Sequence, residues 1–391
     1  MRRDVWRRGR RLATAALLAC VVGCAGTSGD PGQGDRSHGP GSRARGWVVG
    51  IGAAEASGDC RTTDRLIVCP VAPAGAVAHS ASTGAVAWRA GTDRPAGRNS
   101  GLAVDGDRAV SAGGRTLRAV DLATGRAAWT KTYPAGRTVG PPAAAGGVVY
   151  AATYGATVAE PQTLFAYRAS DGTPLWHRAS TETSPVALGS RVYAVEPVGR
   201  TVSRVVARDG QTGKVVATSD VSHPCPDLIS APGYLVCASS GDAAGDTFPP
   251  VVRIDPATLA FRRTLLRPVD KPSGGVISPD GVLVLRTVNA EDPVGGDWTA
   301  VDIRTGRTLW RTTGTSDDVV LAGSRAVWIS GGRLVSVDPR GGPRATGTAA
   351  PRRSPAYREA ADGRSPHLTG YGTHLVVQAK VKPALRSVPA P

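Results

Sequence analysis

Four cysteines have the clearest spacing for covalent chemistry in this chain: Cys60, Cys69, Cys225 and Cys237. They form an even number in a chain whose N-terminus indicates export, and this combination favours disulfides. Cys69 and Cys237 take the same place on a recurring apolar segment, and Cys60 and Cys225 come 9 and 12 residues earlier. Four cysteines allow three pairings, of which we predict Cys60–Cys69 and Cys225–Cys237, each joining the two strands of a hairpin. A redox pair would need Cys-x-x-Cys, which the sequence lacks.

Other residues that could bind a metal, bind a cofactor or catalyse a reaction do not occur at the spacings typical of such sites. The six histidines fall in separate segments without His-x-x-x-His, so we expect no zinc site. The Gly50-x-Gly52 pair continues to Glu55 in place of a third glycine, which argues against a dinucleotide loop. We therefore expect no catalytic residue, no metal ligand and no cofactor. Five aspartates share one repeated position, which indicates turn formation: Asp121, Asp209, Asp255, Asp302 and Asp338.

The N-terminus has the composition of an export signal. Six arginines precede an apolar run of 11 residues, 12–22, which is too short to cross a bilayer as a helix because that takes about 20. Val21-Val22-Gly23-Cys24 closes the run and resembles the lipobox of bacterial lipoproteins. The resemblance implies a signal peptide over residues 1–23 and acyl chains, such as palmitate, that anchor Cys24 to the cell membrane outside the cytoplasm. An ordinary cleaved signal or an uncleaved anchor is the alternative, and the export route, Sec or twin-arginine, stays open.

Charge and composition after the signal narrow the class of partner. Residues 24–45 are rich in Gly, Ser, Pro and charge, which predicts a flexible tether. Removing residues 1–23 takes away six Arg and Asp4, leaving 41 basic and 30 acidic residues and a net charge of +11. A basic exported protein is drawn to anionic lipid or wall polymers. No segment interleaves basic with aromatic residues, so we expect no nucleic acid partner, and we expect a monomer.

A thirteen-residue phrase recurs along the chain. Its clearest copies end at Trp129 and Trp310, with a small residue two before an Asp, Thr-Gly three and four after it, and Trp eight after it. Recurrence every 36 to 47 residues is typical of repeat architectures. Seven copies align on anchor residues at Ser80, Asp121, Arg168, Asp209, Asp255, Asp302 and Asp338. The Trp position holds Trp88, Trp129, Trp176 and Trp310, and elsewhere Ala217, Arg263 and Thr346.

Each part of the phrase has a physical role. The alternating residues before the anchor predict a strand, and Asp-x-x-Thr-Gly predicts a turn in which Gly takes positive φ. The Trp then begins the next strand and offers an apolar plate to the neighbouring sheet. A second strand is predicted upstream of each turn, at 66–69, 109–110, 148–151, 192–193, 235–237, 282–285 and 326–328. Trp298 and Trp328 lie off this register, and packing between sheets is favoured over a ligand surface.

The two ends of the repeat region predict a closed ring. The segment 375–378 is an eighth copy of the upstream strand, without a turn or Trp after it. Trp47-Val-Val lies 41 residues before Trp88, the same distance as from Trp88 to Trp129. We therefore predict an all-β propeller of four-stranded antiparallel blades over residues 46–391, in which the N-terminal strand completes the last blade. Eight blades are favoured, and seven are the alternative.

The Ala-x-Asp-x-x-Thr-Gly-x-x-x-Trp phrase resembles the tryptophan-docking repeat of quinoprotein-type (PQQ-like) β-propellers. The resemblance covers about residues 46–380 and assigns docking roles to Trp47, Trp88, Trp129, Trp176 and Trp310. Quinone enzymes of that family use adjacent cysteines, and this chain has no Cys-Cys pair. The chain looks most like the exported lipoproteins of the family.

Three functions are compatible with such a propeller. The first is a membrane-tethered, non-catalytic scaffold that binds a protein or an envelope polymer. The second is an extracytoplasmic sensor or small-ligand binder that uses the central funnel, and the least favoured is a quinone-dependent dehydrogenase. The Pro- and Arg-rich segment 341–365 is either a docking loop for an acidic partner or a solvated loop.

Overall fold

The computed structural model describes fifteen stretches of the chain. They are residues 46–56, 58–91, 101–155, 162–180, 185–198, 203–220, 225, 227–238, 248–268, 270–288, 296–313, 319–330, 333–343, 366–379 and 383–389. The predicted signal peptide 1–23, the predicted lipidation site Cys24, the tether 24–45 and Thr346 lie outside them, as does most of the segment 341–365.

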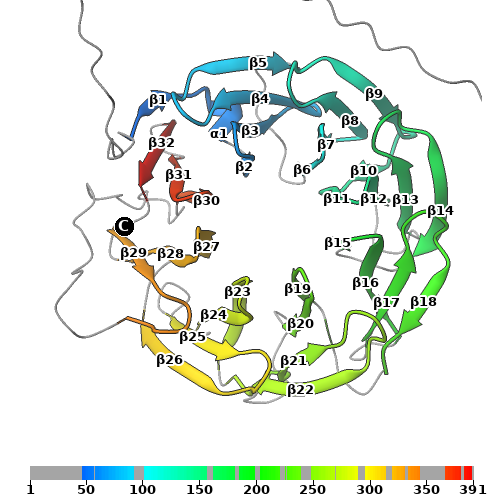
Figure 1. Cartoon of the computed structure of the whole chain (residues 1–391). Coiled ribbons are helices and arrows are strands. Elements are labelled where there is room, and N and C mark those ends of the chain that lie inside the picture. Colours follow the sequence, from blue (N-terminus) through cyan, green and yellow to red (C-terminus); the bar gives the residue numbers. More distant parts are fainter. Residues whose placement is uncertain are drawn as a thin grey trace, which may run out of the picture. The chain divides into compact units, whose positions relative to one another are not determined.

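Eight antiparallel sheets stand around a common centre (Figure 1). Blade 1 is β2 (Arg61–Thr62), β3 (Leu66–Val71), β4 (Gly75–Ser80) and β5 (Val86–Ala90). Blade 2 is β6 (Gly101–Asp105), β7 (Arg108–Gly113), β8 (Thr116–Asp121) and β9 (Ala127–Thr132). Blade 3 is β10 (Thr138–Val139), β11 (Ala143–Ala145), β12 (Val148–Tyr154), β13 (Gln162–Arg168) and β14 (Pro174–Ser180). Blade 4 is β15 (Val186–Leu188), β16 (Arg191–Pro197), β17 (Ser203–Asp209) and β18 (Val215–Thr218).

The second half of the ring repeats this plan. Blade 5 is β19 (Asp227–Ala231), β20 (Tyr234–Ala238), β21 (Val251–Ile254) and β22 (Phe261–Leu266). Blade 6 is β23 (Lys271–Ile277), β24 (Val282–Val288), β25 (Asp297–Asp302) and β26 (Thr308–Thr313). Blade 7 is β27 (Val319–Ala322), β28 (Arg325–Ser330) and β29 (Arg333–Val337). Blade 8 is β30 (His367–Tyr371), β31 (His374–Ala379), β32 (Ala384–Pro389) and β1 (Val48–Gly50).

The predicted all-β architecture of eight blades is confirmed, with two local departures from four strands. In blade 3 the inner position is divided between β10 and β11, which both pair with β12. Blade 7 shows three strands within the described residues. In blade 8, β1 pairs antiparallel with β32, with Val48 opposite Arg386 and Gly50 opposite Ala384. This sheet therefore joins strands from both ends of the propeller.

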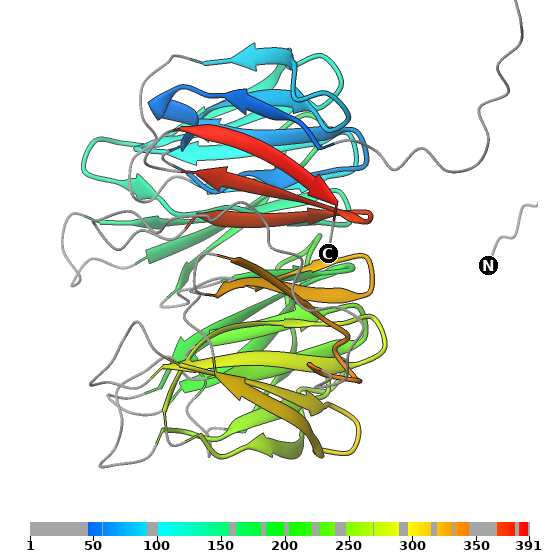
Figure 2. The same ribbon diagram turned by 90° about the vertical axis from the view of Figure 1, so that its left-hand side faces the viewer.

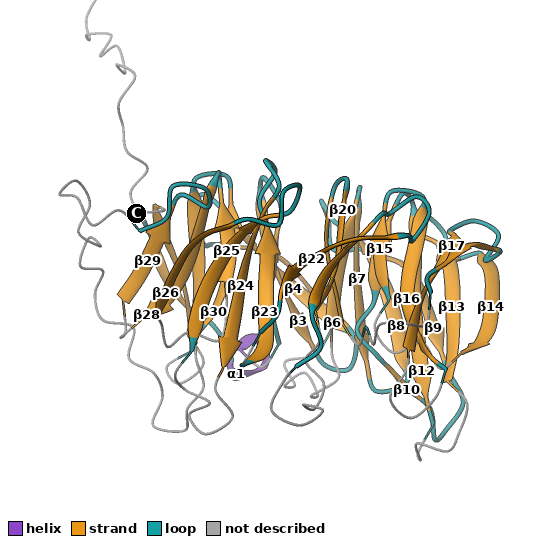
Figure 3. Cartoon of the chain, turned by 90° about the horizontal axis from the view of Figure 1, so that it is seen from below, coloured by secondary structure: helices purple, strands orange, loops and turns teal. Residues whose placement is uncertain are grey.

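The connections divide between the two ends of the ring. In every complete blade the first and third connections lie at one end, because consecutive strands are antiparallel. This end, here named the turn face, carries the seven anchor turns, 80–84, 121–125, 168–172, 209–213, 255–259, 302–306 and 338–342. Figures 2 and 3 show the strands running between the two ends, with the short helix α1 (Ala53–Ala56) at the opposite one. Since β1 is antiparallel to β32, Trp47 enters blade 8 at the turn face.

The core consists of layers between neighbouring sheets. Residues of the middle two strands are buried nearly throughout, as in β12 and β24. Small residues keep adjacent sheets close, and Ala78, Ala119 and Ala166 are all fully buried. This burial explains the small residue two positions before six of the seven anchors, Arg253 in blade 5 being the exception. Within the described residues, no helix is long and apolar enough to cross a membrane.

Candidate functional site

Five tryptophans at the predicted docking positions each reach across a seam between blades. Each indole N–H donates a hydrogen bond of 2.8–2.9 Å to the carbonyl that follows the anchor of the next blade. The pairs are Trp47–Ala81, Trp88–Leu122, Trp129–Ala169, Trp176–Gly210 and Trp310–Pro339. The bond satisfies the one polar atom of a ring that is buried in Trp88, Trp129 and Trp176 and partly buried in Trp47 and Trp310.

The docked indoles pack directly against the turn glycines of the next blade. Gly84, Gly125, Gly172, Gly213 and Gly342 all have positive φ. A Cβ on any of them would lie 2.5–2.7 Å from an atom of the docked indole. Glycine is therefore required twice at this position, once for the backbone conformation and once for the close approach of the ring.

Two seams use other side chains in place of Trp. Between blades 4 and 5, Ala217 stands at the Trp position and Leu259 at the Gly position. Leu259 is 1% exposed and lies in an apolar cluster against which Ala217 packs. Between blades 5 and 6, Arg263 lies against Gly306, where a Cβ would be 2.8 Å from its Cδ, and donates to the carbonyl of Thr305. Trp298 and Trp328 are fully buried and stack on each other, so they pack between sheets.

The four cysteines of the propeller pair within blades 1 and 5. Cys60, just before β2, bonds to Cys69 on β3. Cys225, two residues before β19, bonds to Cys237 on β20. Each disulfide thus ties the segment that leads into the inner strand of a blade to the second strand, and all four cysteines are buried in apolar clusters.

The repeated aspartates act on their own turns, as expected from their shared position. Asp121 Oδ1 accepts hydrogen bonds from the Thr124 N–H at 2.9 Å and the Thr124 hydroxyl at 2.7 Å. Asp209 and Asp255 make the same contacts with Thr212 and Thr258. Hydrogen bonds from the Thr258 N–H and from Arg262 lower the pKa of Asp255 to about 2.

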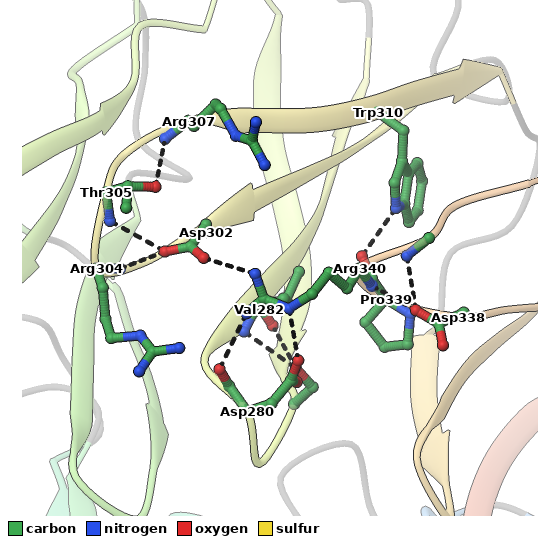
Figure 4. A network of polar contacts seen from close by, with 12 residues as sticks. Asp280, Val282, Asp302, Arg304, Thr305, Arg307, Trp310, Asp338, Pro339 and Arg340 are labelled. Atoms are coloured by element: carbon green, nitrogen blue, oxygen red, sulfur yellow. Dashed lines mark hydrogen bonds and ion pairs between the residues drawn. The ribbon is translucent and has the colours of Figure 1, made fainter.

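One arginine links two of these turns across the seam between blades 6 and 7 (Figure 4). Arg340 Nη1 lies 2.8 Å from Asp302 Oδ2, and its Nε lies 3.0 Å from Asp280 Oδ2. The Arg340 hydrogen bond, opposed by partial burial, lowers the pKa of Asp302 to about 2. No pattern in the sequence indicated this contact, because Asp280 and Arg340 are 60 residues apart.

A buried carboxylate that the sequence did not reveal lies where blade 8 meets blade 1. Glu55 on α1 is 1% exposed and contacts His79 Nε2 at 2.7 Å and Arg89 Nη1 at 2.9 Å. Burial raises the pKa of Glu55, but the hydrogen bonds from His79 and Arg89 outweigh it and hold this pKa below its usual value. Gln378 of blade 8 donates to the carbonyls of Glu55 at 2.6 Å and Gly58 at 2.8 Å. His79 is therefore a packed residue of this seam.

The channel wall contains a cavity of about 590 Å³ between the inner strands of blades 5 and 6. Asp227 and Ser230 line it from β19, and Ser273 and Gly274 line it from β23. At Gly274 the backbone has positive φ and no atom stands within 4 Å of where a Cβ would be, so bare backbone borders this space. Among the described residues, no group of His, Cys, Asp and Glu is placed to hold a metal ion.

Comparison with known proteins fits this geometry. Residues 73–240 match the PQQ-repeat family model described as outer membrane protein assembly factor BamB. The crystal structure of BamB from Moraxella catarrhalis is similar over 87% of this chain and 95% of that one, with a TM-score of 0.55 and 17% identity. The quinohemoprotein alcohol dehydrogenase ADHIIG from Pseudomonas putida HK5 is similar over 88% of this chain and 76% of that one, with a TM-score of 0.59 and 13% identity.

A computationally designed protein, Ika8, shares the same architecture. It is similar over 84% of this chain and 96% of that one, with a TM-score of 0.60 and 14% identity. A search of curated proteins gave no sequence match. The solved structures establish the fold, and the docking contacts explain the repeated phrase in physical terms. The chain has the β-propeller fold of these structures, and its residues 73–240 match the PQQ-repeat family model.

Proposed function

We propose that this chain is an exported lipoprotein whose propeller serves as a non-catalytic scaffold for a protein or polymer of the cell envelope. One observation carries the proposal: the polar groups of the repeat are engaged within and between blades. The anchor carboxylates bind their own turns, and the docked indoles bind the next blade. These groups thus build a rigid ring that presents its surface to a partner. The similarity to an outer membrane assembly factor supports the same role.

The location outside the cytoplasm rests on two features. Disulfides persist in oxidising compartments, and the propeller carries two of them. The lipobox-like sequence ending at Cys24 supplies a means of anchorage, since acyl chains contribute about 0.8 kcal/mol per buried CH₂. Metabolic labelling with an alkyne palmitate tests the anchor. The wild-type protein should incorporate the label and a Cys24→Ser variant should not, while Cys20→Ser retains it.

Site-specific photocrosslinking in living cells tests the scaffold role. A photoreactive amino acid is placed at Arg126, which is exposed on the turn face, and in a second variant at Arg115, which is exposed at the opposite end. A scaffold should yield one envelope component, identified by mass spectrometry, from one end of the ring and not from the other. If neither site crosslinks and the purified protein oxidises alcohols with added quinone, the scaffold proposal is wrong.

The channel-wall cavity favours a second candidate function, the binding of a small ligand. Its volume, about 590 Å³, suits a drug-sized molecule. A ligand should raise the unfolding temperature of the purified protein, because binding to the native state stabilises it. A Ser230→Leu change, which narrows the cavity from β19, should remove that rise.

A further inference from the structure

The anchor turn of blade 1, residues 80–84, lacks the carboxylate that each of the other six anchor turns contains. In five of them the anchor Asp accepts hydrogen bonds from N–H groups two or three residues later. The Asp255 carboxylate, for example, binds Ala257 N and Thr258 N, both at 2.9 Å. In blade 3 the anchor is Arg168, and Asp171 supplies the carboxylate instead, accepting from Thr173 N at 2.8 Å. Blade 1 has Ser80 at the anchor and no acidic residue within its turn.

The blade 1 turn nevertheless keeps the conformation of the others. Gly84 has a φ of 76°, and its N–H donates to Ser80 O at 2.8 Å, the same length as from Gly125 to Asp121. The docked indole of Trp47 also holds the turn through Ala81 O at 2.9 Å. The backbone is therefore already arranged to receive a carboxylate, although the chain supplies none.

The donors that face an anchor carboxylate elsewhere are present in this turn. They are the N–H groups of Ser82 and Thr83 and the hydroxyl of Thr83. Thr83 Oγ1 accepts from Ala85 N at 3.3 Å, as Thr124 Oγ1 accepts from Arg126 N, so its proton remains available to an acceptor. Within the described part of the chain, no acceptor bonds to these three donors. Successive N–H groups that converge in this way form a concave anion site.

A cavity of about 440 Å³ opens beside this turn, between blades 8 and 1. No anchor turn joins the two outer strands of blade 8, because β32 and β1 are far apart in the sequence. Ser80 and Ser82 line it from the turn, and Arg65 and His374 line it from the sides. Asp64 is the one acidic side chain in the wall. Arg65 adjoins the turn, since its carbonyl accepts a hydrogen bond from Ala81 N at 2.8 Å, and the residue is exposed.

We propose that this cavity binds a carboxylate group of a ligand, which takes the position of the missing anchor side chain. The Ser82 and Thr83 donors would bind its oxygens, as the equivalent groups bind Asp255 and Asp302. Arg65 would supply the opposing charge. Asp64 works against ligands of higher negative charge, so a single carboxylate fits the site better than a phosphate dianion. The site is independent of the scaffold role.

Acetate binding to the full-length protein tests the site directly. Saturation transfer to the acetate methyl protons reports binding, and the unfolding temperature is compared with that in sodium chloride of equal ionic strength. The parent protein should bind acetate and be stabilised by it. Ser80→Asp places a carboxylate in the turn, so it should raise the unfolding temperature without acetate and remove the response to acetate. Ser80→Asn places a neutral side-chain acceptor in the turn and tests whether it also removes the response to acetate.

Matched variants separate the site from general charge effects. Arg65→Gln should weaken acetate binding about tenfold, because it removes the positive charge that opposes the carboxylate. Arg304→Gln, which changes an exposed arginine on the turn of blade 6, should leave acetate binding unchanged.

Dialanine with a free or an amidated C-terminus identifies the source of the carboxylate. If only the free peptide binds, and more tightly than acetate, a peptide terminus is indicated; equal binding indicates small acids. An unchanged acetate response in both Ser80 variants, or none in the parent protein, would overturn the proposal.

Discussion

Ala217 and Leu259 exchange the sizes that Trp176 and Gly213 have at the preceding seam, between blades 3 and 4. Leu259 is the one described non-glycine residue with positive φ, 57°, and it is buried in the cluster that Ala217 borders. Its N–H donates to Asp255 O at 2.8 Å, the same turn bond that the glycines make elsewhere. At this seam the small residue is on the strand and the large residue is in the turn. Leu259 therefore fills the space that an indole fills elsewhere.

A double-mutant cycle tests this exchange. Ala217→Trp alone should destabilise the propeller by about 1–3 kcal/mol, because the indole collides with Leu259. Leu259→Gly alone should cost about 2–5 kcal/mol through the cavity it leaves, less the relief of its positive φ. The double variant restores the Trp–Gly pair and should recover most of both losses. Unfolding in urea measures the coupling, and strictly additive losses would show that the two side chains act separately.

Two glycines with positive φ separate the backbone requirement from the docking requirement. Gly125 has a φ of 70° and a docked indole, from which a Cβ would be 2.6 Å, whereas Gly106 has a φ of 56° and nothing within 4 Å. Alanine at either position adds a strain of about 1–2 kcal/mol. Gly125→Ala should cost roughly 1–3 kcal/mol more, since it displaces Trp88. Equal urea midpoints for the two variants would mean that the indole contact adds nothing to stability.

The sequence revealed those features that recur at fixed spacing along the chain. The turn at 121–125 and Trp129 are local and repeated, so their roles followed from the phrase itself. The contact between Gln378 and Glu55 joins residues 323 apart and occurs once, so no periodicity could indicate it. The helix that carries Glu55 has four residues, which is too short for an amphipathic pattern.

The Asp302–Arg340 contact predicts a pH dependence of stability. The pKa of Asp302 falls from 3.8 to about 2 on folding, so its contribution is complete above pH 3.8 and lost as the pH falls towards 2. Arg340→Gln should lower the unfolding temperature at pH 7, and the difference from wild type should shrink below pH 4. Arg307→Gln, an exposed neighbour, is the control for charge. A difference that stays constant down to pH 2 would contradict a role for this carboxylate.

The cluster around Glu55 should be the most sensitive ionic contact described in the propeller. Removing one partner of a buried ion pair leaves an uncompensated charge and typically costs about 3–5 kcal/mol. Glu55→Gln should cost part of this, because a carboxylate that is 2% exposed loses its charged contacts to His79 and Arg89, while water still solvates the Arg89 side chain, which is 46% exposed. Glu196→Gln is the matched control, since Glu196 contacts Arg204 at 2.8 Å with both side chains about one-third exposed. Pairs of that kind contribute about 0–1 kcal/mol. The two free energies of unfolding, measured in urea at pH 7, should therefore differ severalfold. Similar losses would show that the seam between blades 8 and 1 depends on packing and on the Gln378 hydrogen bonds more than on the charge of Glu55.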